Sequence, residues 1–104
     1  MRINGKRYDP TTACEIDQYV KHDRFGNPLS RHDAYYESWT LYKKKTGEYF
    51  LYCEGGALSM FSHTCEDGSR CSGEWIAPLT DKQAYEWKDL MDDYQYEQLD
   101  WHEV

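Results

Sequence analysis

The chain has 104 residues, a formal net charge of −7, 39% hydrophobic residues and 16% aromatic residues. This length fits a single domain spanning residues 1–104. Such an aromatic content argues against a disordered chain. The negative charge disfavours direct binding to nucleic acid, because phosphates require Lys and Arg. No apolar run approaches the ~18 residues of a membrane span, and the first residues lack the apolar segment of a signal peptide. We therefore expect a cytoplasmic protein without a membrane segment.

The first third of the chain predicts a hairpin, a short helix and a loop. Asn4-Gly5 is typical of a type I′ turn, which predicts a small hairpin over residues 2–8. Thr12 and Glu15 have the spacing of a capping box, which predicts a helix from there to about Tyr19. Residues 21–33 contain a Gly-Asn-Pro turn signal and predict a loop.

The middle of the chain predicts three antiparallel strands joined by tight turns. They span residues 34–44, 48–54 and 57–61, with Gly-containing turns between them. Side chains of the second strand alternate between two faces of the sheet. One face receives Tyr49, Leu51 and Cys53, and the other receives Phe50 and Tyr52. Both faces therefore carry large apolar groups, and we expect both to be covered.

The last third predicts a short edge strand at residues 74–77 and a longer C-terminal helix. Thr80 is a suitable N-cap, with Gln83 completing a capping box. The helix carries an apolar stripe at helical spacing: Ala84, Trp87, Met91 and Tyr94. Asp92-Asp93 is expected to end it, and a second helical segment over residues 94–101 buries Leu99. The predicted class is α+β: a small antiparallel β-meander with a short N-terminal helix and a longer C-terminal helix.

Negative charge is concentrated in residues 81–104. This segment has eight acidic and two basic residues, and so carries −6 of the total charge. A basic protein surface is the natural partner for it, although such a run also serves as an ordinary solvated face. The candidate partner-binding residues are Glu86, Asp89, Asp92, Asp93, Glu97 and Asp100.

Four cysteines are the candidate metal ligands: Cys14, Cys53, Cys65 and Cys71. In a reducing compartment, cysteines favour metal binding or free thiols over disulfides. Zinc binds four thiolates tetrahedrally, and a structural zinc site contributes folding energy that a small core lacks. His63 and, less strongly, His22 are substitute ligands. No Cys-x-x-Cys pair is present, so two alternatives stay open: buried and free thiols, or a Cys65–Cys71 disulfide.

The sequence favours a non-catalytic protein over an enzyme. A thiol or metal enzyme remains an alternative, for example with Cys71 as nucleophile and His63 as base. The scattered histidines and abundant carboxylates form no pattern that assigns catalytic roles. The Glu54-Gly55-Gly56-Ala57 segment lacks the Lys of a phosphate-binding loop.

Several motifs resemble a family of small proteins that mobile elements and phages of Gram-positive bacteria encode. The similarity covers about residues 1–90, and its motifs are residues 3–9, 12–13, 41–52, 54–57, 76–80, Ala84 and Trp87. These are mostly turn and core positions, so they inform the fold more than the function. The family pattern has Gly where this chain has Cys53. The resemblance therefore implies that a metal site is confined to the branch of the family that includes this chain.

Within that setting the chain resembles phage anti-CRISPR proteins that inhibit type II Cas9, some of which contain zinc. The resemblance implies stoichiometric inhibition and transfers no catalytic residue. Cas9 has basic channels for its guide and target strands, and an acidic helix is suited to block DNA loading there. The alternative is a non-catalytic adaptor or regulator of a mobile element with another protein partner.

Overall fold

The computed structural model describes residues 1–92 and 95–104, with Asp92 and Gln95 described by their backbone alone. Strands hold more than twice as many of the described residues as helices do. The N-terminal half contains β1 Arg2–Ile3, β2 Lys6–Arg7, β3 Cys14–Val20, β4 Glu37–Lys43 and β5 Tyr49–Gly55. The C-terminal half contains β6 His63–Thr64, β7 Arg70–Cys71, β8 Gly73–Leu79, α1 Asp81–Tyr85, α2 Trp87–Asp92, the 3₁₀ helix η1 Gln95–Gln98 and β9 His102–Glu103.

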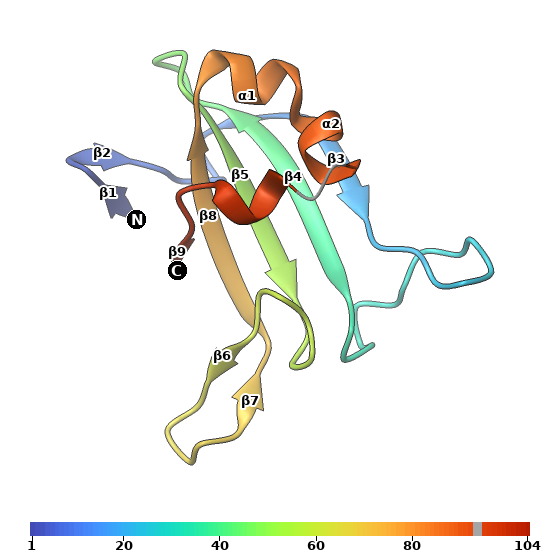
Figure 1. The fold of residues 1–104 in the computed structure, drawn as a ribbon. Helices are drawn as coiled ribbons and strands as arrows, with labels where there is room; N and C mark the ends of the chain where they lie inside the picture. The colour runs from blue at the N-terminus through green and yellow to red at the C-terminus, as the bar shows by residue number, and fades with distance from the viewer. Residues whose placement is uncertain (93–94) are drawn as a thin grey trace.

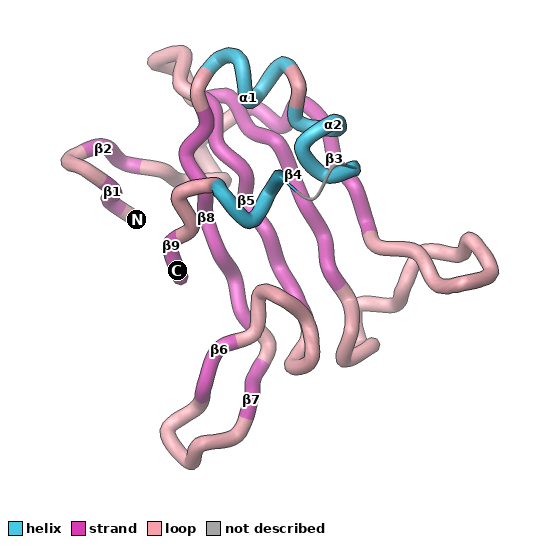
Figure 2. The backbone as a smooth tube through the Cα atoms, in the orientation of Figure 1, coloured by secondary structure: helices cyan, strands magenta, loops and turns pink. Residues whose placement is uncertain are grey.

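One antiparallel sheet of five strands organises the molecule, in the order β3-β4-β5-β8-β9 (Figure 1). Its register aligns apolar side chains in rows across the strands. Trp39, Cys53 and Trp75 form one row, and Leu41, Leu51 and Ala77 form the next. Cross-strand neighbours of this kind stabilise a sheet. Two small hairpins, β1-β2 and β6-β7, extend from the sheet as separate ribbons (Figure 2).

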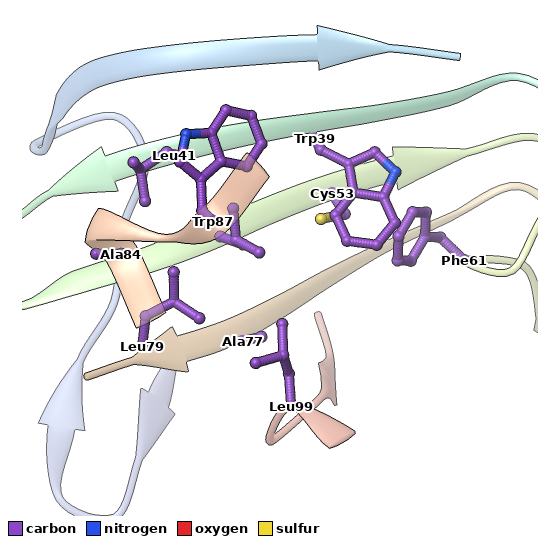
Figure 3. Close-up of a cluster of buried hydrophobic side chains, with 10 residues drawn as sticks. Trp39, Leu41, Cys53, Phe61, Ala77, Leu79, Ala84, Trp87 and Leu99 are labelled. Atoms are coloured by element: carbon purple, nitrogen blue, oxygen red, sulfur yellow. The ribbon is translucent and has the colours of Figure 1, made fainter. Parts of the chain in front are cut away.

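The helical segments cover one face of the sheet and bury the larger core. Ala84 of α1, Trp87 of α2 and Leu99 pack against the two apolar rows (Figure 3). Trp39 is the centre of an aromatic cluster. Its ring lies 5.0 Å from Phe61, 5.2 Å from Tyr96 and 5.5 Å from Trp101 in edge-to-face geometry, an arrangement that aromatic quadrupoles favour.

The N-terminal hairpin covers the opposite face. Ile3, Tyr8, Phe50 and Ile76 form a second buried cluster there, so the prediction that both faces are covered is confirmed. The turn prediction is also confirmed, because Asn4 and Gly5 have φ of 52° and 79°, as a type I′ turn requires.

The predicted α+β class is wrong in its helices, and the first error is the N-terminal helix. Residues 14–20 form β3, paired with β4 from Cys14 opposite Lys43 to Val20 opposite Ser38. A capping box is a local signal, and pairing with a neighbouring strand overrides it. Most side chains of β3 are exposed on both faces, so the strand shows no hydrophobic alternation in the sequence.

The predicted third strand, residues 57–61, is instead a turn. Ser59 is buried, and its hydroxyl donates to the carbonyl of Gly56 (2.7 Å) and accepts from the N–H of Phe61 (3.2 Å). Such local side-chain bonds replace strand pairing. The sheet position belongs to β8, which was expected to be a short edge strand. In the structure it lies between β5 and β9.

The predicted long C-terminal helix is also wrong. Its start is confirmed: Thr80 and Gln83 form the complete capping box. The predicted helix is divided in two: α1 ends at Tyr85, and α2 runs from Trp87 to Asp92. The last turn of α2 has no basic residue, which leaves the negative end of the helix dipole uncompensated. The expected break at Asp92-Asp93 lies partly outside the described residues. No described helix is long and apolar enough to cross a membrane.

Candidate functional site: the β3 groove and the thiol hairpin

The predicted partner-binding acids lie on separate short elements. Glu86 follows α1, Asp89 lies on α2, Glu97 lies on η1, and Asp100 precedes β9; all four are exposed. Asp100 Oδ1 lies 3.0 Å from His102 Nε2. The side chain of Asp92 and the whole of Asp93 lie outside the described residues. The described acids are therefore distributed over several short elements of the helical layer. The sequence had predicted that they share one face of a single helix.

Two hollows lie between the edge strand β3 and the helical segments. Their volumes are about 680 and 610 Å³, and Trp87 lines both. We call this pair of hollows the β3 groove. The larger hollow is lined by Gln18, Tyr19, Lys21, Glu37, Trp39, Trp87, Lys88, Met91 and Tyr96. The smaller one is lined by Ile16, Asp17, Leu41, Lys43, Gly47, Tyr49, Asp81, Ala84, Tyr85 and Trp87.

An ion pair joins the strand to the helix between the two hollows. Lys88 Nζ of α2 lies 3.2 Å from Asp17 Oδ2 of β3. The pKa of Asp17 is lowered, first by the backbone N–H of Gln18, which donates to its carboxylate, and then by Lys88. Asp17 is therefore ionised at neutral pH, and it neutralises one of the two lysines of the larger hollow.

Large apolar side chains are exposed along the groove. Ile16 is 50% exposed, Tyr19 is 41% exposed, and Tyr85 is 92% exposed. Exposed apolar groups beside polar ones are typical of protein-binding surfaces, and tyrosines are enriched in them. The lining of the two hollows holds three lysines and three carboxylates. Glu86 and Asp89 lie outside the lining, on the neighbouring helical layer, and are exposed.

The free edge of β3 is protected against the addition of another strand. The register with β4 shifts between Glu15 and Asp17, which marks a β-bulge at Ile16. The N–H of Gln18 is already bonded to the carboxylate of Asp17 (2.9 Å). Bulges and charged side chains at an edge both oppose strand pairing. A partner of this surface therefore contacts side chains of the groove.

Cys14 and Cys53 lie apart from the other two predicted metal ligands. Cys53 is fully buried in the main core, and this burial raises the pKa of its thiol well above the usual value. Cys14 is exposed at the start of β3. Among the described residues, the ligand atoms that lie within 4.8 Å of one another belong to His63, Cys65 and Cys71. His22 lies elsewhere, in an isolated bridge with Pro28.

Cys65 and Cys71 form a disulfide across the β6-β7 hairpin, with their Cα atoms 6.0 Å apart. This is the pairing that the sequence left open as an alternative to metal binding. We call His63, Cys65 and Cys71 the thiol hairpin site. The zinc site of four cysteines stays a prediction, and the structure brings two of its members together with one substitute ligand.

A pair of glutamates on the other side of the sheet was missed by the sequence. Glu54 of β5 and Glu74 of β8 are direct register partners, an unfavourable arrangement for like charges. Arg31 compensates it, with Nη2 2.8 Å from Glu54 Oε2. Burial, followed by hydrogen bonding to Glu74, raises the pKa of the adjacent Tyr52. The register of β5 and β8 brings the two glutamates together, and no motif in the sequence indicates that register.

Comparison with known proteins gives no family for this chain. No protein family, no curated protein and no solved structure matches it.

Proposed function

We propose that the protein acts by binding a basic protein surface stoichiometrically, and that the contact is made by the β3 groove and the adjacent acids Glu86 and Asp89. The observation that carries this proposal is the combination of a two-part groove with exposed Ile16, Tyr19 and Tyr85. The net charge of the chain indicates which kind of surface the partner presents. The chain carries −7, so a second copy of the chain is repelled while a surface rich in Lys and Arg is attracted.

The partner that we propose is Cas9, in the cytoplasm of a bacterial host. Support comes from the resemblance to anti-CRISPR proteins and from the acidity of the C-terminal third. The basic channels of Cas9 carry nucleic acid, so an acidic protein seated there competes with DNA. The binding mode departs from the expected acidic helix, because the acids lie on several short elements.

The test is a Cas9 cleavage assay combined with gel filtration of the mixture. We expect a complex of the two proteins and loss of cleavage at a near-equimolar ratio. Raising the salt concentration should slow association, because the attraction between opposite charges is screened. A complex without inhibition would indicate the adaptor alternative. If neither a complex nor inhibition is found, Cas9 is not the partner.

Variants test the proposed surface. Tyr85→Ala should weaken binding about tenfold or more, as expected for a central tyrosine, with little effect on folding because the side chain is 92% exposed. The double variant E86K/D89K should also weaken binding. Its matched control, E66K/E103K, makes the same change in net charge at exposed acids outside the groove. Equal effects of the two charge reversals would show that net charge, rather than this surface, determines binding.

A further inference from the structure

We infer that the thiol hairpin site binds a zinc ion when the Cys65–Cys71 disulfide is reduced. The same three residues would then exist in two states, a disulfide with a free imidazole or a zinc complex of His63, Cys65 and Cys71. This inference is independent of the partner proposed above. Its ligand set differs from the four cysteines expected from the sequence, because Cys14 and Cys53 lie outside the group.

The geometry of the hairpin places the three side chains together. His63 and Cys71 are register partners in the β6-β7 ladder. Cys65 follows His63 by two residues, so it lies on the same face of the ribbon. The three ligand atoms lie within 4.8 Å of one another. Ligands 2.0–2.3 Å from a tetrahedral zinc ion lie roughly 3.3–3.8 Å apart, a distance that small side-chain rotations reach.

The turn of the hairpin holds these side chains in place. The carboxylate of Asp67 accepts from the N–H of Ser69 (3.0 Å), and the N–H of Cys65 donates to the carbonyl of Ser69 (2.8 Å). Gly68 supplies the positive φ, 85°, that the turn needs. The ladder itself pairs only two residues on each side. A cross-link across it therefore stabilises a ribbon that neither core cluster includes.

The two states are related by balanced chemistry. A dithiol gives two electrons and two protons to the disulfide, leaves two thiols and becomes a disulfide itself. A phosphine gives two electrons and becomes a phosphine oxide, while one water molecule supplies its oxygen and the two thiol protons. Zinc then replaces the two thiol protons, so two protons are released for each ion bound. An imidazole nitrogen of His63 supplies the third ligand and water the fourth. In the reducing compartment proposed above, thiols are the expected state.

The experiment compares oxidised and phosphine-reduced protein after equilibration with zinc and removal of the excess. We expect about one zinc per chain in the reduced protein and none in the oxidised protein. Cobalt(II) should give a thiolate-to-metal charge-transfer band with the reduced protein only. A reduced protein that binds neither ion would overturn the inference, as would half an equivalent of zinc accompanied by dimer formation.

Three variants locate the ligands. Cys71→Ser should remove both the disulfide and the zinc. His63→Ala keeps the disulfide, so it provides a folded variant, and it should lower zinc affinity at least tenfold. Cys14→Ser is the matched control, since this exposed thiol lies outside the group. Loss of zinc in Cys14→Ser, or unchanged affinity in His63→Ala, would show that other residues hold the ion.

Discussion

Substituting Gly56 by Ala tests how the loop before β4 is held against the sheet. A Cβ atom at position 56 would lie 2.6 Å from the main-chain oxygen of Asp33, and closer still to that of Ala34. Real Cβ atoms essentially never approach within 3.0 Å. Because both obstacles are backbone atoms, rotation of a neighbouring side chain does not relieve the contact, and the loop itself must move.

The size of the effect follows from what resists this movement. Two hydrogen bonds cross the same contact, from the N–H of Gly56 to the carbonyl of Tyr36 (2.9 Å) and from the N–H of Leu58 to that of Ala34 (2.8 Å). Overpacking lowers the free energy of unfolding by about 1–3 kcal/mol. We expect a loss at the upper end, about 3 kcal/mol, because the two hydrogen bonds hold the loop in place. For a domain of this size that corresponds to a fall in Tm of about 12–24 °C.

Thermal and urea unfolding of purified Gly56→Ala provide the measurement. Gly26→Ala is the control, since a Cβ atom there meets no atom within 4 Å and only the positive φ of 80° is penalised, at about 1–2 kcal/mol. If Gly56→Ala loses no more stability than Gly26→Ala, the close backbone contact does not explain why glycine stands here. A larger loss would assign the Glu-Gly-Gly-Ala segment a packing role.

Four further outcomes are expected. Leu99→Ala should cost about 2–5 kcal/mol in urea unfolding, because the side chain is buried in the main core; a change below ~1 kcal/mol would mean that this segment is not docked. Thr80→Ala should cost about 1 kcal/mol by the same measurement through loss of the capping box, and no change would argue against the cap. Thiol labelling followed by mass spectrometry should modify Cys14 at once and Cys53 only on unfolding, since Cys53 is buried with a raised pKa; equal rates would contradict that burial. Thr46 and then Lys44 lower the pKa of Glu48 from 4.5 to about 2, so its ionised form stabilises the fold above pH 4.5 and this contribution is lost as the pH falls toward 2. Glu48→Gln should therefore be less stable than the parent at pH 7 and equal to it near pH 2, and a constant difference across that range would refute the assignment.

Local signals in the sequence were reliable where the backbone itself sets the geometry. Asn4-Gly5 predicted its turn, and Thr80 with Gln83 predicted its cap, because these motifs act within four residues. The alternation of apolar groups in β5 predicted two covered faces. The capping pattern at Thr12 failed because pairing with β4 outweighs a local preference. The sequence does not indicate which strands become neighbours in the sheet.

The candidate sites depend even more strongly on which elements become neighbours in the fold. The β3 groove forms only where an edge strand with exposed side chains meets Trp87 and Lys88 from the last third of the chain. The thiol hairpin site combines Cys65 and Cys71 with His63, which the sequence offered as a substitute ligand. The alternation placed Cys53 on one face of its strand with Tyr49 and Leu51, but a count of four thiols could not show that its register neighbours are two tryptophans.

The position of Trp101 links folding to the order of synthesis. Its ring packs against Trp39, Phe61 and Trp75 at 5.5, 5.4 and 6.1 Å, and its Nε1 donates to the carbonyl of Tyr96 (2.8 Å). Chains fold progressively as they leave the ribosome, N-terminal part first. A chain truncated before residue 99 would therefore leave Trp39, Phe61 and Trp75 without the ring that covers them. Tryptophans exposed in this way would make such a product a target for chaperones and proteases.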